Sequence, residues 1–230
     1  MKRFYKDVSV EKTPAGFRIL LDGKPVKTPG RHDLLLPTRA LADAIAGEWR
    51  VQGETIKPAA MPMLRLANTA LDGVAKSRYE VIAAILRFGE HELICYRAEE
   101  PKLAARQQGA WDPMLDWAAC RYGVKLYTGA GVTHVAQPPE NLTRLRDAIA
   151  AFDDFALAAL HVLVSITGSL VLGLAVAEGT LDSAPAFQLS RMDEDFQAER
   201  WGRDDEAASR AAALAREMQA AATFLVAARD

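Results

Sequence analysis

The sequence has few of the features that mark secreted, metal-binding or nucleic-acid-binding proteins. Its only cysteines, Cys95 and Cys120, are far apart and form no Cys-x-x-Cys pair. This usage argues against a disulfide framework or a cysteine zinc site, and it is typical of a reducing compartment with both cysteines as small buried hydrophobes. The formal net charge is −2, from 28 basic and 30 acidic residues. No overall basic surface therefore indicates binding to nucleic acid.

Targeting signals are also lacking. The first ten residues, MKRFYKDVSV, contain neither the apolar core of a signal peptide nor an Arg- and Ser-rich transit pattern. We therefore expect a cytoplasmic protein.

One apolar run is long enough to cross a membrane. Residues 155–176 carry no formal charge. However, acidic residues flank the run, no Lys or Arg lies close to either end, and Thr167-Gly168 interrupts it near its midpoint. We expect two buried helices that meet at Thr167-Gly168, and no direct insertion into a membrane.

The period of the apolar residues changes once along the chain. Up to residue 36, short alternating segments are separated by turns, and Asp22-Gly23 is a strong hairpin signal. The segments PVKTP and DLLLP are expected to add short strands. Helical patterns dominate afterwards. The predicted fold class is α+β, with a small N-terminal antiparallel β-rich domain that includes one helix over residues 1–60, followed by a larger α-helical domain over residues 61–230.

Several helix boundaries follow from capping residues. Thr38 can cap the first helix, which Gly53 would end, and Pro62 can begin the second. Asp112-Pro113 is typical of a helix start, and Gly123 would close that helix. The apolar positions expected to be buried in the first two helices are Leu41, Ile45, Trp49, Val51, Leu66, Ala70 and Val74.

No motif for catalysis or metal binding is recognisable. The four histidines are isolated, and His161, which lies in the apolar run, is expected in the core. Zinc-protease, esterase and EF-hand patterns are missing, and Gly129-Ala130-Gly131 is a lone Gly-x-Gly that indicates a turn. We therefore expect no catalytic residue, no metal and no cofactor.

The segment SRMDEDFQAERWG, residues 190–202, is the first candidate for a binding surface. On a helix, Met192 and Phe196 share one side, whereas Glu194 and Trp201 lie on the other with Asp193 beside them. An acidic rim next to an exposed aromatic ring is typical of a protein-binding patch. A solvated helix face whose Trp folds back into the core has a similar composition and stays open as an alternative.

A second candidate lies in MLRLANTALD. Arg65, Thr69 and Asp72 recur at a spacing of four and then three residues, which places them on one helix face. The face is either solvated with a local ion pair or used for binding.

Several blocks of the chain together resemble a known family. In order they are LDGKPVKTP, LPTRALADAIAGEWRVQGETIKPAAMPMLRLANTALD, ELICYRAEEP, WDPMLDWA and DEDFQAERWG. They are similar to blocks of the F1-ATP synthase assembly chaperones that bind the alpha subunit, and the similarity runs from residue 4 to residue 224. The chain resembles a bacterial member, because the mitochondrial members carry targeting extensions.

The resemblance implies a monomeric, non-enzymatic chaperone. It would bind the free F1-ATPase alpha subunit and shield the subunit's interface until beta replaces it. The family has a functionally important acid in the block matched by MDEDFQAERWG, which we assign to Glu194, with Asp193 and Asp195 as the neighbouring possibilities. The client-binding residues predicted in this way are Glu194, Asp193, Trp201 and Arg65.

The alternative function is a small-molecule-binding enzyme. It would use a polar pocket between the two domains around Arg65 and Asn68, and a deep pocket there would distinguish it from a chaperone.

Overall fold

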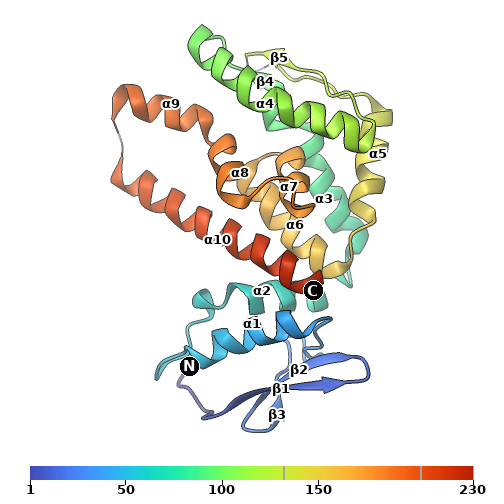
Figure 1. Cartoon of the computed structure of the whole chain (residues 1–230), viewed down its shortest axis with the longest axis vertical. Helices are drawn as coiled ribbons and strands as arrows, with labels where there is room; N and C mark the ends of the chain where they lie inside the picture. The colour runs from blue at the N-terminus through green and yellow to red at the C-terminus, as the bar shows by residue number, and fades with distance from the viewer. Residues whose placement is uncertain (132, 203, 230) are drawn as a thin grey trace. The chain divides into compact units, whose positions relative to one another are not determined.

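The computed structural model describes residues 1–131, 133–202 and 204–229 (Figure 1). The chain forms two compact units. The first unit consists of residues 1–78, 153–159 and 220–230, and the second of residues 79–152 and 160–219. The predicted α+β class is confirmed, because a small antiparallel sheet at the N-terminus precedes a largely helical region. The predicted domain ranges, 1–60 and 61–230, stay a prediction.

The sheet of the first unit is a three-stranded meander. Strands β1 (Val8–Thr13), β2 (Gly16–Leu21) and β3 (Lys24–Pro25) pair in the order β1-β2-β3. The hairpin predicted at Asp22-Gly23 is present, and both residues have positive φ angles of 49° and 76°. The Asp22 carboxylate accepts hydrogen bonds from the backbone N–H groups of Lys6 and Asp7, which fixes the turn. DLLLP contributes isolated bridges rather than a strand of its own.

Helix α1 (Arg39–Arg50) packs on this sheet. The Thr38 hydroxyl accepts a hydrogen bond from the Leu41 N–H, as predicted for an N-cap. Trp49 is buried, and its carbonyl accepts a hydrogen bond of 2.7 Å from the Tyr5 hydroxyl. The predicted burial of Val51 and the end at Gly53 are wrong: the helix ends at Arg50, and Val51 is 77% exposed. Val51 follows Trp49 by two residues, which corresponds to about 200° of rotation around the helix axis. Val51 therefore faces away from the side that Trp49 occupies.

A short helix and a π-helical turn complete the N-terminal segment. Helix α2 (Pro62–Asn68) follows the 3-10 turn η1 (Pro58–Ala60) and continues as η2 (Thr69–Val74). The predicted buried positions Leu66, Ala70 and Val74 are in the core.

The second unit is helical apart from a two-residue parallel pair, β4 (Tyr96–Arg97) with β5 (Gly129–Ala130). The 3-10 turn η3 (Leu93–Cys95) precedes β4. Helices α6 and α10 have several residues in each unit, and α3 begins at the last residue of the first unit's N-terminal segment. The helices from residue 78 onward are α3 (Arg78–Glu90), α4 (Pro101–Tyr122), α5 (Pro139–Ala150), α6 (Asp154–Thr167), α7 (Leu170–Ala177), α8 (Ser183–Ser190), α9 (Met192–Trp201) and α10 (Asp205–Arg229).

The predicted break in the apolar run is confirmed, because α6 ends at Thr167 and α7 begins at Leu170. In the part of the chain that the structure describes, no helix combines the length and the hydropathy needed to cross a membrane. The predicted core position of His161 is wrong, since it is exposed. Ser165, one turn further along α6, is also exposed, so the two residues mark the polar side of this helix.

Two other local predictions are wrong. Pro113 lies inside α4 instead of at its start, because the helix begins at Pro101 and Glu100 caps it by accepting a hydrogen bond from the Leu103 N–H at 2.7 Å. The predicted end at Gly123 is confirmed by its left-handed conformation, with φ of 66°. Cys120 is exposed, whereas Cys95 is buried as predicted.

A buried carboxylate holds the α6–α7 break. Glu92 is 1% exposed, and its two oxygens accept hydrogen bonds from the N–H groups of Val171 at 3.0 Å and Ile94 at 3.4 Å. The neighbouring Leu93 N–H donates to the carbonyl of Gly168. Burial raises the pKa of Glu92 to about 7, although the hydrogen bonds from Ser169 and the backbone act in the opposite direction.

We predict that Trp49→Ala lowers the free energy of unfolding by about 3–5 kcal/mol, because it removes a buried aromatic side chain. Chemical denaturation measures this loss. The matched control is Val51→Ala on the exposed side, which should change stability by no more than about 0.5 kcal/mol. Near-wild-type stability of Trp49→Ala would show that the ring contributes no packing energy.

We also predict a pH dependence that originates at Glu92. Its pKa in the folded protein exceeds the ordinary value, so its contribution to stability is fully present below pH 4.5 and is lost as the pH rises through about 7. The loss is on the order of 3 kcal/mol for this shift. Denaturation of wild type and Glu92→Gln should therefore show that the free energy of unfolding of the wild type falls relative to that of the variant between pH 5 and pH 8. Parallel pH profiles would contradict the assignment.

Candidate functional site

Helix α9 contains most of the predicted binding residues. Phe196 is 7% exposed, whereas Trp201 at the end of the helix is 77% exposed. Trp201 therefore does not fold back into the core. Glu194, Asp195 and Glu199 are exposed as well, so α9 presents acids and an indole ring to solvent.

The buried side of α9 is fixed to α4 through Phe196. The guanidinium groups of Arg106 and Arg200 lie 5.3 Å and 4.7 Å from the centre of the Phe196 ring. Cations at these distances are attracted to the ring and also cover its apolar surface. Phe196 thus has one arginine from α4 and one from its own helix as neighbours.

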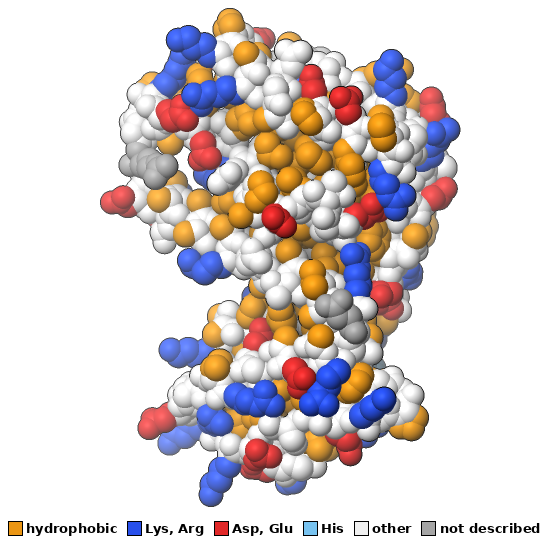
Figure 2. Space-filling view, in the orientation of Figure 1, with side chains coloured by type: hydrophobic (Ala, Val, Ile, Leu, Met, Phe, Trp, Pro, Cys, Tyr) orange, Lys and Arg blue, Asp and Glu red, His pale blue; other side chains and the backbone are white. Residues whose placement is uncertain are grey.

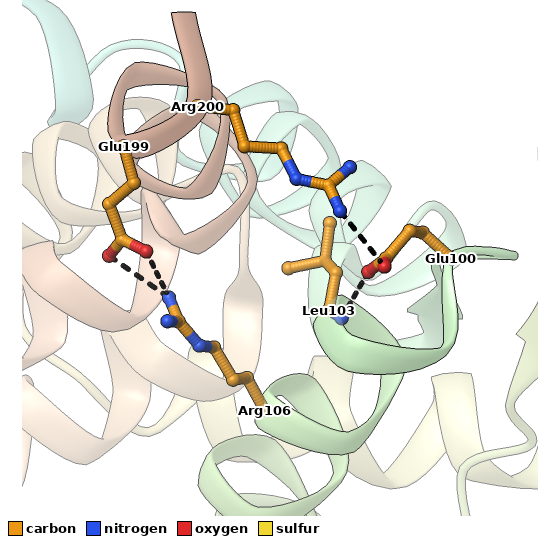
Figure 3. A network of polar contacts seen from close by, with 5 residues as sticks. All are labelled: Glu100, Leu103, Arg106, Glu199 and Arg200. Atoms are coloured by element: carbon orange, nitrogen blue, oxygen red, sulfur yellow. Dashed lines mark hydrogen bonds and ion pairs between the residues drawn. The ribbon is translucent and has the colours of Figure 1, made fainter. Parts of the chain in front are cut away.

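Two ion pairs hold these arginines in place (Figure 3). Arg106 Nη1 donates to both carboxylate oxygens of Glu199, at 3.0 Å and 2.8 Å, and Arg200 Nη2 lies 3.3 Å from an oxygen of Glu100. The other oxygen of Glu100 caps α4. Glu199, one of the acids of the segment, is therefore paired within the protein. Both ion pairs are largely exposed, and we expect each to contribute less than about 1 kcal/mol.

Asp193 anchors the first turn of α9. One of its oxygens accepts a hydrogen bond of 2.6 Å from Gln107, which is fully buried on α4. Gln107 in turn accepts a hydrogen bond from the Ala98 N–H at 2.7 Å. Glu194 has a weaker attachment, because its carboxylate lies 3.8 Å from Arg191 and its side chain is 56% exposed. Of these two acids, Glu194 is the one that is free to meet a partner.

Two open hollows adjoin this region, with volumes of about 470 Å³ and 410 Å³. Arg97 lines both of them, and Asp193 lines the larger one. Arg97 is engaged within the protein: it donates to the carbonyl of Ile94 and to Asp112, and its guanidinium lies over the Trp111 ring. Among the described residues, no group of three or more His, Cys, Asp or Glu side chains is placed to hold a metal ion.

Arg65 belongs to the first unit, whereas the other three predicted residues belong to the second. The predicted binding residues are therefore not gathered within one unit. Arg65 is exposed on α2 and lines an open, mainly apolar hollow of about 290 Å³ together with Asn68. Asp72, from the same predicted face, is used structurally. It accepts hydrogen bonds of 2.7 Å each from Thr28, Gly30 and His32, and the hydrogen bonds with His32 and Thr28 lower its pKa to about 2.

The sequence-based reasoning missed the partners of α9 on α4. Glu100 is the N-cap of α4, and Arg106 and Gln107 lie in its first half, whereas the start of this helix was expected at Asp112. A signal was available, since Glu100-Pro101 is a cap followed by Pro at the first helical position.

We predict that the Phe196 ring, more than the ion pairs, holds α9 in place. Phe196→Ala should accelerate hydrogen exchange across residues 192–201, because it removes a buried ring whose loss typically costs about 3–5 kcal/mol. Arg106→Gln, which removes the cation and the exposed pair with Glu199, should cost less than about 1 kcal/mol and leave that exchange nearly unchanged. Equal effects of the two variants would show that charge is what holds the helix.

Comparisons with known proteins agree with this architecture. A protein-family model described as ATP12 chaperone protein matches residues 2–119. The crystal structure of Atp12 from Paracoccus denitrificans is 45% identical, with a TM-score of 0.95, and the match covers 99% of this chain and 98% of that chain. Protein atp12, mitochondrial, from Schizosaccharomyces pombe is 27% identical over 214 residues, which are 87% of this chain and 74% of that protein. The family expected from the sequence blocks is thereby confirmed, and the chain belongs to the ATP12 chaperone family.

Proposed function

We propose that this chain is an assembly chaperone for the F1 sector of ATP synthase. It binds the free alpha subunit and shields the subunit's interface until beta replaces it. Membership of the ATP12 chaperone family carries this proposal. The physical need is that a subunit of an obligate oligomer exposes a large apolar interface, which aggregates until a partner covers it.

The outward face of α9 is the proposed contact with the client. An exposed Trp beside carboxylates has the composition of a binding hot spot, and the Trp201 ring offers a large rigid surface. Because the Phe196 side of the helix is fixed to α4, little conformational freedom remains to be lost on binding. The acids Glu194 and Asp195 favour a basic segment of the client.

Apolar surface on the second unit fits the same role. Figure 2 shows hydrophobic side chains gathered over a broad area on the visible face of the second unit. A chaperone that covers an apolar interface needs such a surface. We propose that the chain works stoichiometrically, as a cytoplasmic monomer without enzymatic activity, and that beta displaces it by competition.

The alternative, a small-molecule-binding enzyme around Arg65 and Asn68, has no observation in its favour. The hollow at these residues is open and mainly apolar, and it lies wholly within the first unit. It is not the deep polar pocket that such an enzyme needs.

We predict that Glu194→Lys weakens binding to the isolated alpha subunit. If Glu194 pairs with a desolvated basic group, the charge reversal should cost on the order of 2–5 kcal/mol, whereas a pair at the rim would cost well under 1 kcal/mol. The melting temperature should hardly change, because the side chain is more than half exposed. Isothermal titration and suppression of alpha-subunit aggregation measure the effect.

The matched control is Asp116→Lys, which makes the same charge reversal at an exposed acid of α4. It should bind the alpha subunit as the wild type does. Loss of folding and binding together in Glu194→Lys would show a structural role for Glu194. Retention of both would leave α9 as an ordinary solvated helix face, and failure of the wild type to bind the alpha subunit would overturn the proposed function.

A further inference from the structure

The basic residues of the chain are unevenly distributed between its two units. The first unit has 15 Lys and Arg against 11 Asp and Glu, whereas the second has 13 against 19. Figure 2 shows Lys and Arg side chains spread over the visible face of the first unit, which contains the sheet and α1. The first unit therefore favours acidic partner surfaces, whereas the second favours basic ones.

The open hollow of about 290 Å³ beside α2, which we call the α2 hollow, lies on the basic unit. It is lined by Pro58, Ala59, Met61, Leu64, Arg65 and Asn68. Four of these six residues are apolar, and they make the hollow a place for an apolar side chain. Arg65 is an exposed cation of the lining, and its charge also acts on the Glu48 carboxylate. Lys57, a second exposed cation, directly precedes η1 in the sequence.

The two segments that bound the α2 hollow are fastened to α1 and to the turn that follows it. The Glu48 carboxylate accepts hydrogen bonds from the N–H groups of Met63 at 2.8 Å and Leu64 at 2.9 Å. The Gln52 side chain accepts from the Lys57 N–H at 2.7 Å and donates to the carbonyl of Glu48. The hollow is thus already formed in the free protein, and an occupant does not have to order it.

Asn68 adds a polar requirement to the hollow. Its carboxamide oxygen is buried and accepts no hydrogen bond from the residues that the structure describes. A buried acceptor that lacks a hydrogen bond costs free energy. An occupant with a donor group, towards which the Asn68 carboxamide turns, would remove that cost.

We propose that the α2 hollow is a second docking point for the client, occupied by an apolar side chain from a segment that also carries carboxylates. The apolar lining selects a side chain, and Lys57 and Arg65 select the negative charge that accompanies it. This inference rests on the proposed function in taking the F1 alpha subunit as the source of the segment. The α9 face then binds a basic part of the client and the α2 hollow binds an acidic part, so that the client is recognised at two points of opposite charge.

The test uses the full chain and isolated F1 alpha subunit. Arg65→Glu reverses the charge at the hollow, and Ala59→Tyr fills the hollow without changing any charge. Each should weaken binding roughly tenfold, and the effect of Arg65→Glu should shrink as salt is added. Lys12→Glu is the matched control, since Lys12 is an exposed cation on β1 that does not line the hollow. It should stay within about twofold of wild type.

Wild-type binding by Arg65→Glu and Ala59→Tyr, both with unchanged melting temperature, would overturn the proposal. Combination with Glu194→Lys provides an independent check, because two separate docking points should have additive effects on the binding free energy.

A second probe separates failure of this inference from failure of the proposed function. If the wild type does not bind the alpha subunit, two amphipathic helical peptides test the α2 hollow directly. They have the same apolar residues, but one carries Glu where the other carries Lys. The acidic peptide should shift the amide resonances of Ala59 and Leu64, and the basic peptide should not. Equal shifts from both peptides, or binding of anionic phospholipid vesicles that Arg65→Glu abolishes, would assign the hollow to another kind of partner and overturn the inference.

Discussion

The complete burial of α7 is the constraint around which the second unit is organised. All eight of its residues are buried, so the N–H groups in its first turn cannot reach water and need acceptors from the protein. Ser169 accepts from the Leu172 N–H, and Glu92 accepts from the Val171 N–H. A carboxylate thus enters the core because an apolar helix begins there. Its raised pKa is the physical consequence of placing an ionisable group where water is excluded.

The surface chemistry of α9 follows from the way in which this helix is attached. Phe196 has two arginines as neighbours, and Asp193 and Glu199 form hydrogen bonds with side chains of α4. These contacts engage Asp193 and Glu199 within the protein and leave Glu194 and Trp201 exposed to solvent. The acidic run therefore divides into residues that hold the helix and residues that can meet a partner. This division suits a binding protein, since the exposed groups are presented on a rigid element.

Unit by unit, the molecule offers contrasting surfaces for recognition. The α9 face is acidic and aromatic, and the α2 hollow is apolar with basic neighbours. The α9 face is held in place by the hydrogen bond from the buried Gln107 to Asp193, and the α2 hollow by hydrogen bonds from backbone N–H groups to the half-buried Glu48. Preformed surfaces of this kind reduce the ordering cost of binding, which is consistent with a protein that holds another chain.

Local sequence signals determined the features that depend on a few adjacent residues. The Asp22-Gly23 hairpin, the Thr38 cap, the left-handed Gly123 and the break at Thr167-Gly168 were predictable, because turns and caps need particular side chains at fixed positions. Family membership was predictable as well, since ordered blocks along the chain carry it. Helical periodicity predicted the burial of Trp49 and placed Phe196 on the side of its helix opposite Glu194 and Trp201, because it orients side chains without knowledge of their neighbours.

The tertiary structure alone decided which polar residues are used internally. Pro113 is accommodated within α4, His161 and Cys120 reach the surface, and Glu199 pairs with a residue 93 positions away. Nothing in the local sequence distinguishes Glu199 from Glu194, because both are acids on one short helix. Their different roles depend on whether an arginine or glutamine of α4 lies within hydrogen-bonding distance. That distance is set by the packing of whole helices against one another, and the periodicity of a single segment carries no information about this packing.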